Sequence, residues 1–287
     1  MIDISIIIVT YNSGEDIENC LNSVLNEKSP TYEIIVIDNA STDNTKEVLK
    51  KYEKVLTVVY ATYNLGYSRA NNIGFRYAKG KYIFLLNPDA TLNPGSLKKM
   101  FDIIEKNNDV IAVAPLLLNL DGTVQSSIRS FPDYRVLFFE LTGLSRIFPA
   151  SRFFNRWRLP GFRYDKIQDV EQPMASAILL RRSFFKKDFM DESFTMFFND
   201  VDLCYRIKSG GGRILFFPYA SVMHIRGKST GKEREKMIPL HTKGFIRYFV
   251  KHRKTLKDKI LFLLFLPWLI LNTILRIVLL RFFALDF

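Results

Sequence analysis

The sequence contains little cysteine. Of its 287 residues only Cys20 and Cys204 are cysteines, and they lie far apart in the chain. Two such cysteines provide neither a disulfide framework nor a thiolate metal cluster. A disulfide-rich secreted scaffold is therefore excluded, and a reducing cytosol is the simplest compartment for this chain.

Several catalytic signatures are also missing. The sequence has no GxGxxG fingerprint, no lysine-containing phosphate loop of the Walker type and no HExxH motif. Dehydrogenase, P-loop nucleotidase and zinc-protease functions are therefore disfavoured. Residues 1–11 lack both a basic region and a long apolar run, so they predict a buried strand and not a signal peptide.

Apolar residues are plentiful, and the charge is unevenly distributed. Hydrophobic residues make up 48% and charged residues 24% of the chain, which excludes extensive disorder. The net charge is +12, and residues 228–287 contribute +9 of it, because they include 13 basic and 4 acidic residues. The basic character therefore belongs mainly to the C-terminal tail.

Strand-like and helix-like segments alternate in the first 115 residues. Short β-branched or aromatic runs occur at 4–9, 33–38, 55–60, 82–86 and 110–115, and segments of helical period lie at 17–25, 42–52, 70–78 and 97–104. This order predicts an α/β fold with a mixed, mainly parallel sheet that is flanked by helices. In such a fold, ligands bind at the carboxyl ends of the strands.

The C-terminal tail has the composition of a membrane-associated helix. The apolar run 260–275 would be about 24 Å long as a helix, shorter than the roughly 30 Å hydrocarbon core, and Arg276 follows it. We expect a helix, kinked at Pro267, that lies in the interface with Trp268 at headgroup depth. The basic segment 251–259 suits the anionic cytoplasmic leaflet. A buried C-terminal helix and an oligomer interface are the alternatives, and nucleic acid is disfavoured as a partner because the charge adjoins a lipid-like run.

Acidic and amide side chains follow several predicted strands. They occur in VTYN at 9–12, IDNASTD at 37–43, NLGYSRANN at 64–72 and LLNPDA at 85–90. Taken alone, residues 38–43 are typical of a turn and helix cap, and Asn-Pro-Asp is an ordinary β-turn. Farther along, Asp200 and Asp202 open a predicted helix, and His224 follows a strand-like segment. Each segment on its own is weak evidence for a site.

Taken in order, however, six segments resemble glycosyltransferase family 2 enzymes with the GT-A fold, and most closely bacterial rhamnosyltransferase-like members. They are VTYNS at 9–13, IDNASTD at 37–43, NLGYSRANNIGF at 64–75, LLNPDA at 85–90, FFNDVDLCYRI at 197–207 and VMHIRG at 222–227. The resemblance implies a Rossmann-like nucleotide-diphospho-sugar transferase domain over residues 1–230. Within it, 1–115 would be the nucleotide-binding half and 116–230 the acceptor half, with 231–287 as the membrane-associated tail.

The resemblance also implies roles for individual residues. The nucleotide would be bound by Thr10, Tyr11, Asn12, Asp38, Asn39, Asn64, Gly66, Arg69, Asn71 and Asn87. Asp89 and His224 resemble the family's protein ligands for Mg²⁺ or Mn²⁺, a cation that would neutralise charge on the departing diphosphate. Asp200 matches the catalytic base that takes the proton of the acceptor hydroxyl.

The acceptor side departs from the family pattern. Asn199 stands where relatives usually have Glu, and the segment before Arg181 reads Ser-Ala where the family often has Gly-Ala. We expect Asp202, Asn199 and Arg181 to contact the acceptor, with Asp202 as an acceptor orienter or a helix cap. The preferred base is Asp200 rather than Asp202.

The resulting hypothesis is an inverting, metal-dependent enzyme at the cytoplasmic face of the cell membrane, peripheral or monotopic. It would move L-rhamnose from dTDP-rhamnose to a lipid-linked saccharide during cell-surface polysaccharide synthesis. Transfer of galactose or N-acetylglucosamine from a UDP-sugar is the nearest alternative. A catalytically silent sugar-nucleotide-binding scaffold and a nucleotidyltransferase are others. The sequence leaves the oligomeric state open.

Overall fold

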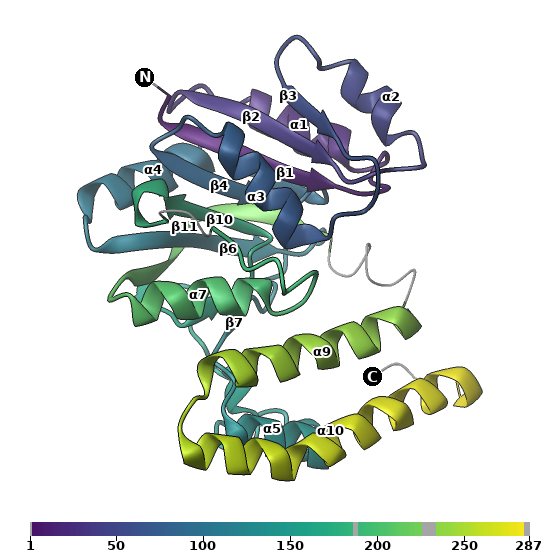
Figure 1. Ribbon diagram of the computed structural model, residues 1–287. Helices are drawn as coiled ribbons and strands as arrows, with labels where there is room; N and C mark the ends of the chain where they lie inside the picture. The colour runs from purple at the N-terminus through teal and green to yellow at the C-terminus, as the bar shows by residue number, and fades with distance from the viewer. Residues whose placement is uncertain (1, 186–188, 226–233, 284–287) are drawn as a thin grey trace.

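The computed structural model describes residues 2–185, 189–225 and 234–283 (Figure 1). The chain forms a nine-stranded sheet in the order β3-β2-β1-β4-β10-β6-β11-β5, and β8 pairs with β11 at the side. Its strands are β1 (Ile4–Thr10), β2 (Tyr32–Asp38), β3 (Thr57–Tyr60), β4 (Tyr82–Leu86), β5 (Ala90–Leu92), β6 (Val110–Leu118), β8 (Gln168–Asp169), β10 (Ala177–Arg181) and β11 (Arg213–His224). A separate pair consists of β7 (Ile128–Arg129) and β9 (Gln172–Pro173).

The described helices are α1 (Ile17–Leu25), α2 (Thr45–Lys50), α3 (Tyr67–Tyr77), α4 (Ser96–Lys106), α5 (Tyr134–Thr142), α6 (Leu144–Ile147), α7 (Asn199–Ser209), α9 (Arg234–His252) and α10 (Leu256–Phe283). Two 3₁₀ turns, η1 (Arg156–Arg158) and η2 (Arg182–Phe184), complete the list. The predicted α/β architecture is therefore confirmed.

The sheet is mixed because a strand from the second half enters it. Strands β3, β2, β1 and β4 are parallel neighbours, and β6 and β11 also pair in parallel. Between these two groups lies β10, which runs antiparallel to both β4 and β6. The insertion of β10 brings residues of the second half of the chain next to the carboxyl end of β4, where Ala177 pairs with Leu86.

Both faces of the sheet are covered by apolar packing. On β1, alternate residues point to opposite faces, so Ile6 joins the core with α1 while Ile7 joins the core with α3 and α7. All seven residues of β1 are buried. A continuous apolar strand of this kind is typical of a parallel sheet covered on both sides.

The C-terminal helices share a core with residues of the segment 137–201. Phe245, Tyr248 and Phe249 of α9 are buried in one cluster with Phe198 and Val201. A Cβ at Gly244 would lie 2.9 Å from the Phe198 ring, so only glycine allows α9 to approach this closely. The segment 234–283 therefore packs against the α/β domain, and the predicted boundary at 230/231 lies outside the described residues.

The last helix presents opposite faces to protein and solvent. Phe262, Phe265, Leu269 and Thr273 recur at helical spacing and face α9 and α5, and the Thr273 hydroxyl lies 2.7 Å from that of Thr242. Leu264, Trp268, Leu271 and Leu275 recur on the other face and are 50% exposed or more. Among the described helices, α10 is the one long and apolar enough to cross a membrane. Only 6% of its most apolar window is buried inside the protein, so α10 is not a core helix.

Candidate functional site

Two of the residues that the resemblance assigns to the nucleotide, Thr10 and Asp38, are neighbours at the carboxyl edge of the sheet. Thr10 of β1 is in register with Asp38 of β2, and both side chains are fully buried. Among the described residues, the Thr10 Oγ1 and Asp38 Oδ2 atoms have no hydrogen-bond partner. An unsatisfied buried polar atom costs about 1–3 kcal/mol, so a ligand that donates a hydrogen bond would be favoured here.

Asparagine side chains shape the loop that covers this edge. The Asn39 Nδ2 atom donates to Asn64 Oδ1 at 2.9 Å, and Asn39 Oδ1 accepts from the Leu65 N–H at 2.7 Å. The Asn64 Oδ1 atom also accepts from the Gly66 N–H at 2.9 Å. Gly66 has φ +79° and lies against Thr195. Asn39, Asn64 and Gly66 therefore define the loop geometry from which a nucleotide would be contacted.

The remaining predicted nucleotide residues lie around the same loops. Asn12 accepts a hydrogen bond from the Thr42 N–H at 2.8 Å, and Tyr11 beside it is 46% exposed. Asn71 is buried and donates to the Tyr67 carbonyl. Arg69 is half exposed, 3.8 Å from Glu192, so its guanidinium can reach a ligand in solution.

Asp89 and His224 lie side by side, although 135 positions separate them in the sequence (224 − 89). Asp89 directly precedes β5, whose Ala90 pairs with His224 of β11. The Asp89 Oδ1 atom lies 3.6 Å from His224 Nε2, and both side chains are more than 90% buried. This arrangement combines a hard oxygen donor with an imidazole, as the resemblance implied.

A buried glutamine fixes the orientation of His224. Gln125 Nε2 donates to the carbonyl oxygen of His224 at 3.1 Å and to Asn119 Oδ1 at 2.9 Å. Its Oε1 atom is therefore the acceptor that faces His224 Nδ1, at 2.8 Å. Because Nδ1 then carries the proton, Nε2 presents its lone pair toward Asp89. Sequence reasoning missed Gln125, since no motif contains it.

This donor set fits a hard divalent cation that also binds a diphosphate. Within the described residues no cluster of three or more His, Cys, Asp or Glu side chains has the spacing of a complete metal site. Two protein ligands leave several coordination positions for phosphate oxygens and water, which is how Mg²⁺ is usually held beside nucleotides. Asp89 and His224 are thus suited to a cation that arrives with its nucleotide.

Asp200 lies in the first turn of α7, beside Gln172 of β9. Its Oδ1 atom accepts from the Val201 N–H at 2.8 Å, and its Oδ2 atom accepts from Gln172 Nε2 at 3.2 Å. Burial raises the pKa of Asp200, although backbone hydrogen bonds and the charge of Arg129 oppose this shift. A carboxylate whose pKa is raised in this way is a stronger proton acceptor than a free aspartate.

Tyr67 connects the two halves of the site. Its hydroxyl lies 3.4 Å from Asn87 Oδ1 and 3.4 Å from the Ala175 carbonyl oxygen. Burial raises the pKa of Tyr67, and the negative charges of Asp200 and Asp89 raise it further. The Tyr67 hydroxyl therefore lies between Asn87, two residues before Asp89, and Ala175, whose backbone is hydrogen-bonded to Asp200. The sequence signal was present, because Tyr67 belongs to the NLGYSRANN segment, but no role was assigned to it.

Asp202 has a structural setting. It is 1% exposed and is bound by Arg206 at 2.9 Å, Lys251 at 2.6 Å and His252 at 2.7 Å. Burial alone would raise the pKa of Asp202, but these partners outweigh burial and lower it. The helix-cap interpretation is wrong, because Phe198 is the N-cap of α7. We therefore assign Asp202 to the α7–α9 contact and not to the acceptor.

The other two residues expected at the acceptor also have internal partners. Arg181 pairs with Tyr82 at the start of β4, opposite the edge that carries Asp89. Its guanidinium donates to the carbonyls of Ile104 and Asn107 at the end of α4. Asn199 is buried and donates to the Met196 carbonyl. Arg181 is therefore not assigned to the acceptor, and Asn199 shapes the turn before Asp200.

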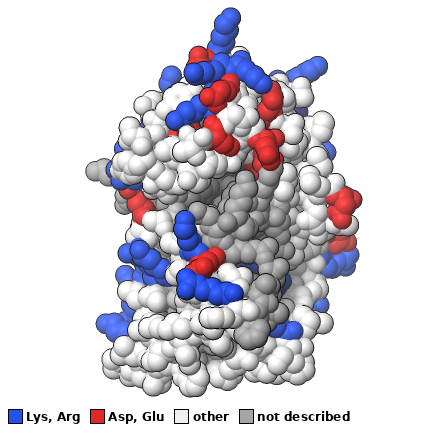
Figure 2. Space-filling model, turned by 90° about the vertical axis from the view of Figure 1, so that its right-hand side faces the viewer, with Lys and Arg blue, Asp and Glu red and all other residues white. Residues whose placement is uncertain are grey.

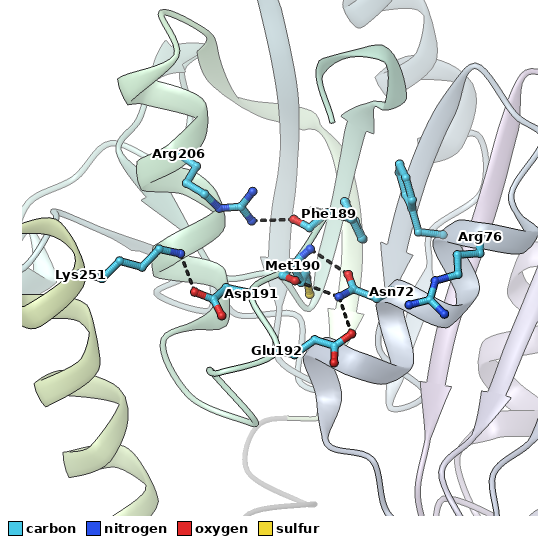
Figure 3. A pocket seen from close by; sticks show the side chains of 9 residues that line it. Asn72, Arg76, Phe189, Met190, Asp191, Glu192, Arg206 and Lys251 are labelled. Atoms are coloured by element: carbon cyan, nitrogen blue, oxygen red, sulfur yellow. Dashed lines mark hydrogen bonds and ion pairs between the residues drawn. The ribbon is translucent and has the colours of Figure 1, made fainter. Parts of the chain in front are cut away.

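A cavity of about 530 Å³ lies apart from this edge, between α3, α7 and α9 (Figure 3). Its lining includes Arg206 and Lys251, which hold Asp202, and Asn72, which donates to the Met190 carbonyl. None of the residues predicted to bind nucleotide or metal, and not Asp200, lines it. The candidate site is therefore the edge of the sheet that carries Asp38 and Asp89, together with Asp200 of α7.

The chain is similar to curated transferases over most of its length. It is 27% identical over 256 residues to the N-acetylglucosaminyl-diphospho-decaprenol L-rhamnosyltransferase of Mycobacterium tuberculosis, covering 83% of this chain and 81% of the relative. It is 25% identical over 260 residues to a rhamnosyltransferase of Escherichia coli, covering 86% and 93%.

The fold is also similar to that of a solved enzyme. The structure of GalNAc-T7 with UDP, GalNAc and Mn²⁺ superposes with a TM-score of 0.60 at 20% identity, covering 78% of this chain and 44% of that chain. At this identity the likeness extends to the fold, which is GT-A-like. The sequence model described as "Glycosyl transferase family 2" matches residues 5–189, more than half of the chain. The protein is therefore a glycosyltransferase that belongs to family 2.

Proposed function

We propose that this glycosyltransferase is inverting and metal-dependent, and that it moves L-rhamnose from dTDP-rhamnose to a lipid-linked saccharide in cell-surface polysaccharide synthesis. The proposal is carried by the contacts of the Tyr67 hydroxyl with Asn87, two residues before Asp89, and with Ala175, whose backbone is hydrogen-bonded to Asp200. Asp89 in turn lies 3.6 Å from His224. This arrangement provides a diphosphate site and a proton acceptor side by side.

The donor would lie along the carboxyl edge of the sheet. Asp38 would accept the N3–H hydrogen bond of the pyrimidine base, and the Thr10 hydroxyl would donate to a carbonyl oxygen of the base, so that both buried oxygen atoms gain a partner. The diphosphate would approach the N-terminus of α3, where the helix dipole favours anions. The N–H groups of Gly66 and Tyr67 are themselves bound to Asn64 Oδ1 and the Thr195 carbonyl. Arg69 in the first turn adds a fixed positive charge.

Asp89 and His224 would hold Mg²⁺ or Mn²⁺ against the diphosphate. A bound divalent cation neutralises the negative charge that develops as the diphosphate leaves. Gln125 keeps the His224 ring in the tautomer that presents Nε2. Tyr67, whose hydroxyl contacts Asn87 and Ala175, would line the site beside this pair.

Asp200 would act as the general base. The acceptor hydroxyl oxygen attacks the anomeric carbon, the bond from that carbon to the diphosphate oxygen breaks, and the hydroxyl proton passes to the Asp200 carboxylate. Gln172 orients this carboxylate through its hydrogen bond to Oδ2. One displacement of this kind inverts the configuration at the anomeric carbon.

The choice of rhamnose is supported by the two curated relatives, both named as rhamnosyltransferases. The lipid-linked acceptor is supported by the mycobacterial relative, whose name specifies a diphospho-decaprenol acceptor. The UDP bound to GalNAc-T7 keeps a UDP-sugar as the second candidate donor.

A donor panel tests this proposal. Purified full-length protein is incubated with Mn²⁺, a polyprenyl-diphosphate-linked acceptor, and either dTDP-rhamnose, UDP-galactose or UDP-N-acetylglucosamine. We expect release of dTDP and a glycosylated lipid with dTDP-rhamnose. Rapid turnover of a UDP-sugar alone would refute the rhamnose assignment, and binding of nucleotide without turnover of any donor would favour a silent scaffold.

The exposed face of α10 would lie on the cytoplasmic leaflet. Contacts with α9 run from Phe262 to Arg281, which pairs with Glu235, so the helix lies alongside the protein over most of its length. Because α9 is rich in charge, α10 cannot cross the bilayer without moving that charge into hydrocarbon. A helix that lies in the interface is therefore favoured.

Replacing two leucines of this face is expected to release the protein from membranes. Each leucine contributes about 1.5–3 kcal/mol when it is buried in apolar surroundings, so Leu264→Gln with Leu271→Gln should weaken vesicle binding at least about a hundredfold. Co-sedimentation with phosphatidylglycerol-containing vesicles measures the change. Val55→Gln, at an apolar residue of similar exposure, is the control. Unchanged binding of the double variant would place the membrane contact elsewhere.

Loss of the Gln125 amide is expected to weaken cation binding. Gln125→Leu removes the acceptor for His224 Nδ1–H, and loss of such a partner typically costs 10–100-fold in metal affinity. Gln125→Glu keeps an acceptor oxygen and should recover part of the affinity. Titration of Mn²⁺ by electron paramagnetic resonance, with dTDP present, measures both. Equal affinities for wild type and Gln125→Leu would show that His224 is oriented independently of Gln125.

A further inference from the structure

The segment that contains α5 and α6 exposes large apolar side chains next to α10. Phe138, Ile147, Phe148 and Phe153 are between 44% and 66% exposed. A cluster of exposed aromatic residues is unusual on a soluble surface and marks an interaction site. These residues lie in the acceptor half, far from the C-terminal tail in the sequence.

Aromatic contacts connect this cluster to α10. The Phe265 ring of α10 lies 6.4 Å from Phe138, which contacts Phe139. Phe139 contacts Phe153, at a centroid distance of 5.3 Å. The Tyr134 hydroxyl also donates to the Asp258 carbonyl at 2.6 Å, which joins the start of α5 to the start of α10. The α5–α6 cluster therefore packs against α10 through Phe265, so its exposed side chains lie beside this helix.

Positive charge accompanies this apolar surface. Residues 134–158 contain five arginines and one acidic residue, Glu140, which gives +4. Glu140 is held by Arg158 at 2.5 Å, so it does not offset Arg135 or Arg152, which are exposed. In Figure 2 the lower end of the molecule, where Figure 1 shows α10 and α5, is mostly uncharged, and Lys and Arg side chains gather above it.

We propose that residues 134–154 dock on an anionic lipid bilayer together with α10, so that the protein rests on the membrane through two segments. This inference rests on the proposed membrane location of α10 and extends it to the acceptor half. An apolar face rimmed by arginine matches the hydrocarbon and headgroup layers of such a bilayer. A second copy of the chain fits less well, because a symmetric contact would bring the same arginines together.

The consequence is a fixed orientation of the catalytic edge. A single helix on the surface leaves the domain able to rotate about the helix axis, whereas two joined segments remove that freedom. The α5 segment contacts α10, and α9 packs beside α7, which carries Asp200. The height and tilt of Asp200 above the lipid headgroups would then be set by the two segments together.

Site-specific labelling tests the proposal. Both native cysteines are buried, so a cysteine placed on the surface can be labelled selectively with an environment-sensitive fluorophore. Four full-length variants are compared: Phe148→Cys, Phe153→Cys, Leu264→Cys as the α10 reporter and Val55→Cys as the exposed control distant from both segments. Each is mixed with phosphatidylcholine vesicles, with or without phosphatidylglycerol, that carry spin-labelled lipids as quenchers.

We expect labels at 148, 153 and 264 to shift to the blue and to be quenched on phosphatidylglycerol vesicles, while the label at 55 stays unchanged. Quenching at 264 alone would overturn the proposal and leave the membrane location of α10 intact. A blue shift at 148 and 153 without vesicles, dependent on protein concentration, would overturn it in favour of a second copy. Binding of dTDP by all four variants is measured as a control. If it equals that of the wild type, the outcomes above report on membrane contact and not on the proposed donor site.

A charge variant provides a second, independent measurement. Arg135→Glu with Arg152→Glu should weaken binding to phosphatidylglycerol vesicles at least about tenfold while leaving the apolar residues in place. If the double variant bound these vesicles as tightly as the wild type, the two arginines would not contact the membrane, and the two-segment contact would be refuted.

Discussion

Asp200→Asn is expected to lower the rate of sugar transfer at least about a hundredfold while nucleotide affinity stays at the wild-type value. The amide cannot accept the proton of the acceptor hydroxyl at neutral pH. It keeps nearly the same shape, and its oxygen can still accept from the Val201 N–H. The loss would therefore appear in kcat for the acceptor reaction and not in binding of dTDP.

The matched control is Asp165→Asn. Asp165 is exposed and pairs with Arg163, away from the site, so the same chemical change there should leave the rate unaltered. Isothermal titration with dTDP checks that the Asp200 variant retains its donor pocket. A variant with wild-type transfer would remove Asp200 from the role of base.

The pH profile of the wild type follows from the same group. Asp200 acts only when deprotonated, and burial raises its pKa above the ordinary value for aspartate. Transfer should therefore fall as the pH falls through this raised pKa, and the midpoint should lie above that of a solvent-exposed aspartate. The residual activity of Asp200→Asn should lack this acidic limb.

Asp89→Asn is expected to produce a loss of similar size through a different step. Replacing the carboxylate removes one of two protein ligands and its negative charge, so Mn²⁺ should bind the nucleotide complex at least about a hundredfold more weakly. Transfer should fall with it, because the developing charge on the diphosphate is no longer neutralised. Nucleotide binding in the absence of metal should be nearly unchanged.

Electron paramagnetic resonance of Mn²⁺ in the presence of dTDP measures this loss directly, apart from turnover. His224→Gln should behave like Asp89→Asn, whereas Asp165→Asn should bind Mn²⁺ like wild type. Raised Mn²⁺ concentration is expected to restore part of the rate of Asp89→Asn. Wild-type Mn²⁺ affinity in both site variants would show that these two side chains are not the ligands.

The regular half of the protein could be predicted from the sequence because local patterns determine it. Strands β1, β2 and β4 are short apolar runs, and in a parallel sheet their carboxyl ends meet at one edge, which placed Thr10 beside Asp38. The proximity of Asp89 and His224 was expected only from the resemblance. Antiparallel pairing of β5 with β11, which are far apart in the sequence, brings them together, and no local pattern reveals that pairing.

What the sequence did not reveal depends on contacts between distant segments. Arg181 was expected at the acceptor, but the antiparallel entry of β10 carries it to the opposite end of β4. In the sequence, Asp202 resembles a second carboxylate of the site. In the structure it is bound by Lys251 and His252 of α9. Residues 234–252 contain a proline and many charges, so their helical core contact through Tyr248 was not visible as a pattern.

The most direct test of the account is a crystal structure with Mn²⁺ and dTDP, using the anomalous signal of manganese to locate the ion. The account predicts one Mn²⁺ bound by Asp89 and His224 Nε2 and by oxygen atoms of the diphosphate, with the base hydrogen-bonded to Asp38 and the Asp200 carboxylate facing the open side of the diphosphate. Manganese bound elsewhere, or a nucleotide that leaves Asp38 and Asp89 uncontacted, would contradict it.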